Sequence, residues 1–453
     1  MHDLPLPKEF RTEILQQVLS ILRSGESCAL VGVGSSGKSN IARHLTRADV
    51  RLHYFEASAA QVFVLYLNCK PFAHRAPHDL YLHALDQLIR AIEELDGAFT
   101  PLQPGVNALW QEAQANPPSL AKRNLDKAID QVVRAGAEHM IIILDDCEDL
   151  FAKALPILFT DLRELRDNHK LRVVYLTLTR REPAFLRTDT REYEELFELL
   201  SPAGHTIPVP PYVQRDGFHM LQRLAARQDP PHRLSETEVR LLFELGGGHG
   251  GLIRSLYFAT QHSADLLTPD TLDRLAAHAD VEAECHKILD SLEEDERADL
   301  RGIVRRETPS ADGLRRLQQR GLIHPSLAGS PGIFSSVFER FLRQQFGPAP
   351  ESIQIEFPGV GWQVWINGEL IVNLNWPEFE ILRRLAEKRP QACPIAELIE
   401  TMRLAERGKQ EDRAQGNPLE RLNQYVQQLK AKMGPAGQFI RQEGDSYRLT
   451  GQQ

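Results

Sequence analysis

The stretch CALVGVGSSGKSNIARHL, residues 28–45, decides the fold. It joins an apolar run, Cys28–Val33, through a glycine-rich turn to a helical pattern. The turn GVGSSGKS, Gly32–Ser39, has the spacing GxxxxGK[ST] of a phosphate-binding loop. Glycines let backbone N–H groups curl around phosphates, and the start of a helix adds a partial positive charge. The residues that we expect to bind nucleotide phosphates are Gly32, Gly34, Ser35, Ser36, Gly37, Lys38 and Ser39.

Two acidic residues follow a second apolar strand, Met140–Leu144. We expect Ser39 and Asp145 to hold Mg²⁺, and Lys38 to neutralise the outer phosphates of ATP. Asp146 is expected to orient or deprotonate the attacking water. Capping of the next helix would explain one of the two acids but not the pair. Asp146 is shorter than the glutamate that many hydrolysing ATPases have at this position, so the sequence predicts slow turnover.

Polar residues that end the next strand and open a later helix extend the predicted catalytic site. Arg180, together with Thr179, can reach the γ-phosphate from the strand beside the acids. Arg254 follows the glycine-rich stretch GGGHGG and can point back at the phosphates. The alternative for Arg180 is a basic residue at an exposed strand end without a role in the site. The alternative for Arg254 is a surface arginine after a tight turn. Glu148 and Asp149 are expected to be solvated charges on the helix after the acids.

Alternating strand and helix patterns over residues 1–210 predict an α/β P-loop NTPase core with a parallel sheet. Residues 211–280 have helical patterns that suit a lid over this core. Residues 99–118 are rich in Pro, Asn and Gln and are expected to form a surface excursion. The expected strands are Cys28–Val33, Val62–Asn68, Met140–Leu144, Leu171–Leu178 and His205–Val209.

Length and composition exclude several classes of protein. The 453 residues suffice for about three domains, and 42% apolar residues predict folded cores. The net charge of −9 argues against a protein that coats nucleic acid throughout, but it allows one DNA-binding domain. The five cysteines form no CxxC pair, which disfavours a zinc site or a disulfide framework. With neither a long apolar run nor a signal-peptide pattern, we expect a cytoplasmic protein without a membrane segment.

The pattern changes after residues 347–350, which are an expected linker. Residues 351–453 predict three antiparallel strands, three helices and a terminal β-hairpin. The third helix begins at Pro418, and its apolar residues share one face. Its other face and the hairpin offer side chains that can contact bases or phosphates. The residues expected to contact DNA are Arg421, Gln424, Gln427, Gln428, Lys430 and Lys432 on the helix, and Arg441 and Arg448 on the hairpin.

Residues 10–280 resemble the AAA+ and signal-transduction (STAND-type) P-loop ATPases. The segments that carry this resemblance, in the family's order, are GVGSSGKS, IIILDDCEDL, TLTRR, VPPY (Val209–Tyr212) and GGGHGGLIR. The resemblance implies that ATP or ADP binds with Mg²⁺ and that the nucleotide controls how the lid packs. Gly250 stands where many relatives have proline. Arg187 and Arg191 are the candidates for an arginine finger.

Two further resemblances complete the expected fold. Residues 281–347 are similar, through LQQRGLIH and IFSSVFERFL, to the small winged-helix domain packed behind such ATPase cores. Residues 351–453 resemble the OmpR/PhoB-type winged-helix DNA-binding domain, through EFEILRRL and DSYRL. That resemblance implies an α+β winged helix-turn-helix domain whose helix Leu419–Lys432 enters a major groove. Acidic and basic residues nearly balance over this region, so protein contacts are the alternative use of such a domain.

These observations predict an ATP-binding, nucleotide-switched transcription regulator that binds double-stranded DNA. Because one weakly basic domain is a poor binder alone, we expect a homo-oligomer in one nucleotide state. A DNA-remodelling or initiator-like AAA+ ATPase is the first alternative. A defence or signalling ATPase scaffold whose C-terminal domain binds protein is the second.

Overall fold

The computed structural model describes most of the chain in two compact units. Unit 1 comprises Met1–Asp299 and Ser310–Phe338, and unit 2 comprises Leu300–Pro309 and Glu339–Gln453. The expected linker at 347–350 lies outside the described residues. The described residues are 5–95, 97, 99–202, 204–228, 234–260, 269–305, 307–324, 331–346, 355–357, 364–366, 369–371, 374–389, 391–406 and 417–450.

A five-stranded parallel sheet forms the centre of unit 1, as the sequence predicts. The strands lie in the order β2-β3-β4-β1-β5, so β4 has the strand of the phosphate loop on one side and β3 on the other. Their apolar runs are buried along almost their whole length, as strands covered on both faces require. The strands are β1 (Cys28–Val31), β2 (Val62–Asn68), β3 (His139–Asp145), β4 (Val173–Thr179) and β5 (Thr206–Pro208).

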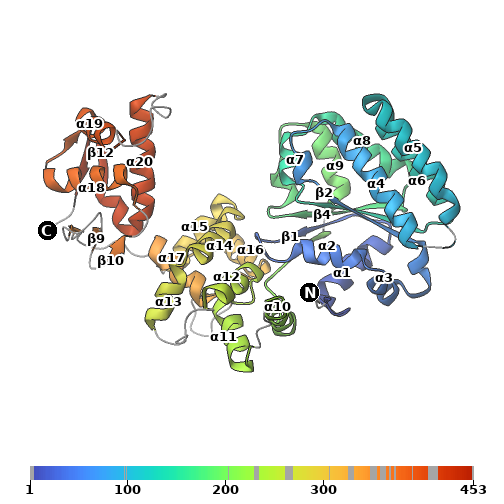
Figure 1. Ribbon diagram of the computed structural model, residues 1–453, viewed down its shortest axis with the longest axis horizontal. Coiled ribbons are helices and arrows are strands. Elements are labelled where there is room, and N and C mark those ends of the chain that lie inside the picture. Colours follow the sequence, from blue (N-terminus) through green and yellow to red (C-terminus); the bar gives the residue numbers. More distant parts are fainter. Residues whose placement is uncertain are drawn as a thin grey trace. The chain divides into compact units, whose positions relative to one another are not determined.

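Helices cover both faces of this sheet (Figure 1). Alternate residues of β3 enter different cores: Met140 and Ile142 face one cluster, and Ile141 and Ile143 face the other. One face carries α1 (Thr12–Arg23), α2 (Lys38–Thr46) and α3 (Ala48–Phe55). The other face carries α4 (Pro77–Leu95), α5 (Gln103–Ala115), α6 (Pro117–Arg134), α7 (Glu148–Lys153), α8 (Pro156–Asn168) and α9 (Arg191–Leu200).

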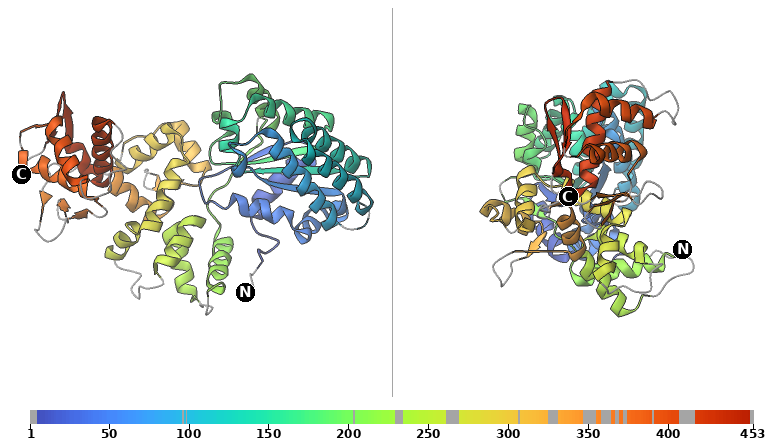
Figure 2. Two further views of the ribbon diagram at one scale, coloured as in Figure 1. Left: turned by 45° about the horizontal axis from the view of Figure 1, so that its top comes forward. Right: turned by 90° about the vertical axis from the view of Figure 1, so that its left-hand side faces the viewer.

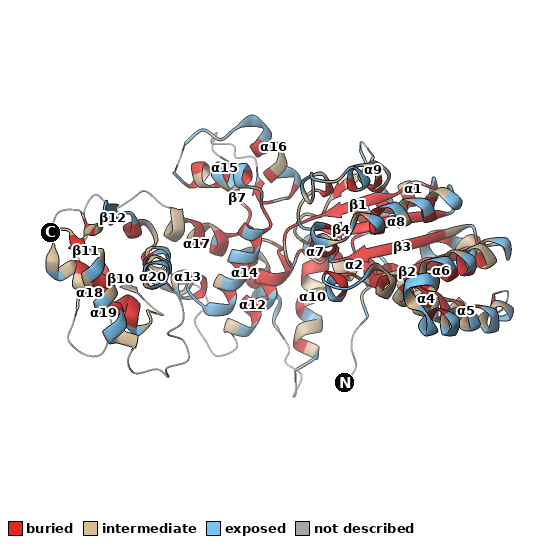
Figure 3. Ribbon diagram, turned by 90° about the horizontal axis from the view of Figure 1, so that it is seen from above, coloured by how far each residue is buried: buried red, intermediate tan, exposed pale blue. Residues whose placement is uncertain are grey.

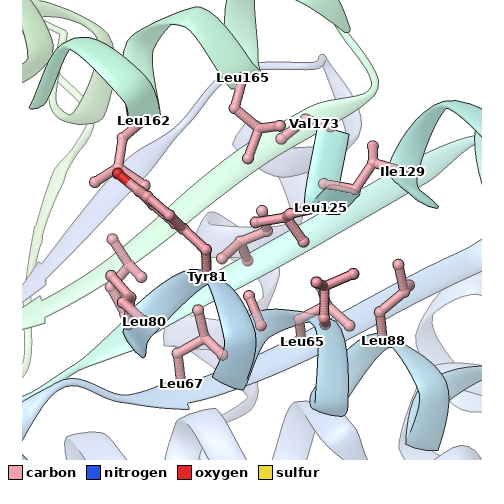
Figure 4. Close-up of a cluster of buried hydrophobic side chains, with 14 of the residues drawn as sticks. Leu65, Leu67, Leu80, Tyr81, Leu88, Leu125, Ile129, Leu162, Leu165 and Val173 are labelled. Atoms are coloured by element: carbon pink, nitrogen blue, oxygen red, sulfur yellow. The ribbon is translucent and has the colours of Figure 1, made fainter. Parts of the chain in front are cut away.

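The larger core gathers Tyr81 and leucines of β2, α4 and α6 among its buried residues (Figure 4). The buried Tyr81 hydroxyl donates to Asp161 Oδ2 at 2.7 Å, so this polar group keeps a partner. Residues 99–118 do not form the expected surface excursion, because α5 packs on α4 and α6 with Val106 and Ala113 buried. Its Pro and Gly residues stand in the first turn of the helix, where they are tolerated.

Unit 1 continues with helices on the carboxyl side of the sheet (Figures 1 and 2). A capping box of Ser235 and Glu238 starts α11, and Gly247, with φ of 56°, ends it. The elements are α10 (Gln214–Ala226), α11 (Glu236–Gly246), α12 (Gly250–Thr260), α13 (Pro269–Ala276), α14 (Ala279–Asp290), α15 (Glu294–Arg305), α16 (Ala311–Gln319), β6 (Ile323–His324), β7 (Gly332–Ile333) and α17 (Ser336–Phe346). Helices α15 and α17 contribute residues to both units.

Unit 2 has its own apolar core, formed around residues such as Leu382, Leu398 and Val426 (Figure 3). Its elements follow the predicted order of strands, helices and hairpin. The strands form two antiparallel sheets, β10-β9-β8 and β11-β13-β12. The elements are β8 (Ile355–Glu356), β9 (Val364–Ile366), β10 (Glu369–Ile371), α18 (Trp376–Lys388), β11 (Cys393–Pro394), α19 (Ile395–Glu406), α20 (Pro418–Lys432), β12 (Ile440–Glu443) and β13 (Ser446–Leu449). Among the described residues, no helix combines the length and apolar character needed to cross a membrane.

Candidate nucleotide site

The predicted phosphate loop follows β1 at the carboxyl edge of the sheet. Ser35, with φ of 58°, and Gly37, with φ of 95°, are left-handed, which turns the chain sharply before α2 begins at Lys38. Glycine is required at position 37, because a Cβ there would collide with the Tyr212 hydroxyl. The loop therefore points the start of α2 into the space above it, where an anion is favoured.

Lys38 lies within the loop that it is expected to serve. Its ammonium donates to the carbonyl oxygens of Gly32 at 2.7 Å and Val33 at 3.1 Å. Burial lowers the pKa of Lys38 to about 8, and the charges of Glu148 and Asp145 oppose this shift. An anion bound beside the ammonium would also favour its charged form.

A cavity of about 530 Å³ lies over the loop, a volume that suits a nucleotide. The structure brings most of the predicted residues to it; Gly32, Asp145 and Thr179 do not line it. The predicted residues at its wall are Gly34, Ser35, Ser36, Gly37, Lys38, Ser39, Asp146, Arg180 and Arg254. The residues that line it in addition include Asn40, Lys70, Glu148, Tyr212, Met220, Gly250, Gly251, Glu284 and Lys287.

The two acids after β3 differ in their surroundings. Asp145 is buried: its Oδ2 accepts from the Tyr66 hydroxyl at 2.6 Å, and its Oδ1 accepts from the Asp146 N–H at 3.0 Å. Asp146 lines the cavity and has a left-handed backbone, with φ of 51°. Desolvation, and then the neighbouring charge of Asp145, raises the pKa of Asp146. Tyr66 on β2 could not be found from a motif, because its role depends on the register of β2 against β3.

Glu148 is not the solvated charge that the sequence suggested. It accepts hydrogen bonds from the backbone N–H groups of Arg180 and Arg181, and its Oε2 lies 2.6 Å from Arg180 Nε. This carboxylate therefore fastens the end of β4 to the start of α7. Thr179, the last residue of β4, is buried, and its hydroxyl has no hydrogen-bond partner among the described residues.

The glycine-rich entry to α12 touches the phosphate loop through His249. The Leu252 N–H donates to His249 Nδ1 at 3.2 Å, so the proton is on Nε2, which donates to the Gly34 carbonyl oxygen at 2.8 Å. Burial lowers the pKa of His249 to about 4, which keeps the ring neutral. Arg254 lines the cavity from the same helix and lies near the Phe258 ring.

Arg11 is a second residue without a sequence signal. It is buried and left-handed, with φ of 55°. Its guanidinium donates to the carbonyl oxygens of Ser36, Pro210 and Pro211 at 2.8–3.1 Å, and it lies 4.3 Å from the centre of the Tyr212 ring. One side chain thus joins the segment before α1, the phosphate loop and the connection from β5 to α10.

The two candidates for an arginine finger differ in the exposure of their side chains and in their partners. Arg187 donates to the carbonyl oxygens of Phe151 and Ala154 and pairs with Asp189, and its side chain is 14% exposed. Arg191 is 85% exposed and pairs along α9 with Glu195 at 2.9 Å, a surface ion pair of little energetic weight. Of these two, Arg191 has the side chain that a neighbouring molecule could contact.

The residues predicted to contact DNA lie in unit 2 on α20 and the β12–β13 hairpin. Three of the cations have acidic partners within the unit: Arg421 with Glu406 at 2.9 Å, Lys432 with Glu378, and Arg448 with Glu443 at 2.9 Å. The pKa of Lys430 is lowered by burial. The remaining residues are exposed; they are Gln424, Gln427, Gln428 and Arg441.

Solved structures of low sequence identity are similar to much of this chain. The Walker-type ATPase PABY2304 of Pyrococcus abyssi matches over 74% of this chain and 95% of its own, at 16% identity and a TM-score of 0.40. The ORC2 protein of Aeropyrum pernix, in ADPNP–ADP complexes, matches over 76% and 96%, at 15% identity and 0.40. The ORC1 protein of the same organism, in complex with DNA, matches over 76% and 94%, at 14% identity and 0.37.

No curated protein matches this sequence. A family model described as the AAA ATPase domain matches residues 8–175. The matched segment includes the phosphate loop, strands β1 to β3 and the two acids, Asp145 and Asp146, at the end of β3. Residues 8–175 are thus similar to the AAA ATPase domain.

Proposed function

We propose that the chain is a slow ATPase of the AAA type that binds ATP or ADP with Mg²⁺ in the cavity of unit 1. The observation that carries the proposal is the meeting of the phosphate loop, Asp146 and Arg180 around one nucleotide-sized cavity. The buried hydroxyl of Ser36, which lines the cavity and has no hydrogen-bond partner among the described residues, also suits a phosphate ligand there.

Different residues of the cavity would bind the phosphates and Mg²⁺. Lys38 exchanges its two carbonyl partners for phosphate oxygens, and the loop N–H groups hold the phosphates. Ser39 would hold Mg²⁺, and the ion would neutralise negative charge that develops on the phosphates. Asp145 is buried and does not line the cavity, so it would hold the ion through a water molecule.

Asp146 acts as the base that takes a proton from the attacking water. Arg180 lines the cavity but pairs with Glu148, so a contact with the γ-phosphate competes with this ion pair. The short side chain of Asp146 and the cost of freeing Arg180 both favour slow turnover. The protein then remains long enough in each nucleotide state for that state to control a partner.

Calorimetric titration with ATP and ADP in the presence of Mg²⁺ tests the proposal. Lys38→Ala should weaken binding by about 100-fold or more, because it removes a charge-assisted contact to phosphate. Lys122→Ala is the matched control, since Lys122 forms a surface ion pair with Glu164 outside the cavity. Equal affinity of Lys38→Ala and the unaltered protein would refute the site.

For the wider role, we propose an initiator- or remodelling-type action on double-stranded DNA. An AAA ATPase domain with an acid pair supports a turnover-dependent role, and exposed Gln424, Gln427 and Gln428 on α20 offer groups for base edges. We take residues 281–347 and 351–453 to be two winged-helix domains beside a core at 1–210 and a lid at 211–280. Assembly of several copies would compensate for the few unpaired cations on each α20.

The order of elements in unit 2 supports a second candidate, the nucleotide-switched transcription regulator. ATPase assays with and without duplex DNA separate the two. An initiator or remodelling enzyme should hydrolyse ATP several-fold faster with DNA, and Asp146→Asn should abolish the stimulation. A regulator should instead bind DNA with an affinity that differs between ATP and ADP, without stimulated turnover. If no duplex binds at low salt with either nucleotide, the protein-binding scaffold takes precedence over both.

A further inference from the structure

Helix α14 presents one polar face to the phosphate loop. Glu284, Lys287 and Ser291 stand at i, i+3 and i+7, the spacing of a single helical face. Glu284 and Lys287 line the nucleotide cavity. No motif marks these residues, because they lie some 250 positions beyond the loop in a segment whose sequence indicates only a helix.

Ser291, just after α14, holds the loop directly. The Gly34 N–H donates to Ser291 Oγ at 2.8 Å, and the same hydroxyl donates to the Lys287 carbonyl oxygen at 2.6 Å. The carbonyl oxygen of Gly34 accepts from His249 at 2.8 Å. Both the N–H and the carbonyl oxygen of Gly34 are thus held by residues that follow the sheet in sequence. A shift of α14 therefore requires that the hydrogen bond between Gly34 and Ser291 break.

The Glu284 side chain is buried beside the loop, and only one of its oxygens has a partner. Its Oε1 pairs with the Lys287 ammonium. Its Oε2 has no hydrogen-bond partner among the described residues, and it lies so close to Gly251 that a Cβ on Gly251 would collide with it and with the Ser35 side chain. A carboxylate is therefore held where phosphates are expected, a charge that repels them.

The end of α14 is also connected to the end of β4. Arg320, just after α16, donates to the carbonyl oxygen of Arg180 at 2.8 Å and forms a buried ion pair with Glu296 on α15. Arg181 pairs with Glu293 at 2.7 Å. A displacement of α14 consequently disturbs the strand end that carries Arg180, and the reverse also holds.

We propose that the Glu284–Lys287 ion pair is an exchangeable lock on the nucleotide site. When nucleotide binds, its phosphates replace Glu284 as the partner of Lys287, and Glu284 leaves the cavity. The displaced side chain shifts α14 and loosens the Ser291 contact with Gly34, which transmits occupancy to α15 and α16. Glu284 thus weakens nucleotide binding, and Lys287 strengthens it. This inference rests on the proposed nucleotide site.

The test is the affinity for ADP, measured with a fluorescent ADP analogue on the full chain. Glu284→Gln should bind ADP about tenfold more tightly, because a like charge beside the phosphates is removed while the side chain keeps its shape. Lys287→Met should bind about tenfold more weakly. Glu282→Gln removes a carboxylate from the same helix outside the cavity and should change the affinity less than twofold.

Unchanged or weaker ADP binding by Glu284→Gln overturns the lock. For this reading, the single variant Lys38→Ala must lose ADP binding, which shows that ADP binds at the phosphate loop. A folded, unaltered protein that binds no ADP overturns the proposed nucleotide site and the lock together. Circular dichroism without nucleotide checks that each variant is folded. Lys287 is 56% exposed, so its replacement should leave the fold intact. A separate readout is amide hydrogen exchange at residues 32–37: ADP should increase the exchange of the Gly34 amide relative to its loop neighbours.

Discussion

The phosphate loop of unit 1 and helix α20 of unit 2 were both expected to bind phosphates, yet their polar side chains have different settings. At the loop, the buried hydroxyl of Ser36 lines the cavity and has no hydrogen-bond partner among the described residues. On α20, Arg421 and Lys432 already pair with acids of their own unit. A ligand completes the first arrangement, whereas it must compete with existing partners in the second.

The difference teaches that residue type predicts a ligand contact best where the fold leaves the side chain unsatisfied. A buried polar atom without a partner costs roughly 1–3 kcal/mol, so a phosphate that satisfies it gains that energy. A surface ion pair is worth only about 0–1 kcal/mol, but it neutralises the charge that a distant phosphate would attract. Each of the following four changes breaks or sharpens this contrast, in order of decreasing effect.

Loss of a buried ion pair in unit 1 should have the largest effect. Arg320→Met leaves Glu296, which is 0% exposed, without its cation, so the free energy of unfolding should fall by about 3–5 kcal/mol. Arg315→Met, on the neighbouring helix α16, should change it by less than about 0.5 kcal/mol, because that side chain is 60% exposed. Urea unfolding followed by circular dichroism measures both, and equal values would show that the buried pair is not needed.

Removal of the proposed base should separate binding from chemistry. Asp146→Asn keeps the size of the side chain but cannot take the proton, so hydrolysis should slow by about 100-fold. ADP affinity should change less than threefold or rise slightly, since a negative charge near the phosphates is lost. Single-turnover hydrolysis and calorimetry provide the two numbers. Hydrolysis at the normal rate would mean that another group activates the water.

The pH dependence of nucleotide binding should report Lys38. Its pKa is lowered to about 8, so the ammonium is present below that pH and is lost as pH rises through it. Because phosphate binds the charged form, affinity should fall about tenfold between roughly pH 7 and pH 9. Lys38→Arg keeps its charge over this range. A flat profile for the lysine protein, or the same slope for the arginine variant, would contradict this assignment.

Removal of the acidic partners of two arginines in unit 2 should have the smallest effect. It should make these arginines available to a ligand, as the polar groups of the phosphate loop are. Glu406→Gln and Glu443→Gln remove the carboxylates beside Arg421 and Arg448. If this surface meets DNA, the double variant should bind duplex a few-fold more tightly, with a salt dependence steeper by up to about two counterions. Glu387→Gln, an acid on α18, is the control. An unchanged salt dependence would mean that DNA binds away from Arg421 and Arg448, or that the protein does not bind DNA.

The sheet and most of the cavity could be predicted from the sequence because their signals are local. The strand Val62–Asn68 matches residue for residue, and the limits of the other strands differ by at most two positions. Glycines and Lys38 at fixed spacing define a loop whatever surrounds it. Residues 99–118 were misjudged because proline and glycine in a first helical turn have the same composition as a loop.

The rest of the site could not be predicted, because it depends on contacts between distant segments. Tyr66 reaches Asp145 only through the pairing of β2 with β3. Ser291 meets Gly34 across 257 positions of sequence. Glu148 looked solvated because the sequence alone does not show that the start of α7 lies against the end of β4. Such partners become visible only when the fold is known.

The place of Arg11 bears on how fragments of this protein should be cut. Secondary structure alone suggests starting a fragment at Thr12, where α1 begins. Such a fragment keeps every helix and strand but loses the guanidinium that holds Ser36, Pro210 and Pro211 together. Its phosphate loop and the Pro210–Pro211 segment would then lose the side chain that joins them. A failure of that fragment to bind nucleotide would reflect the choice of boundary, and only fragments that begin before Arg11 give a fair assay.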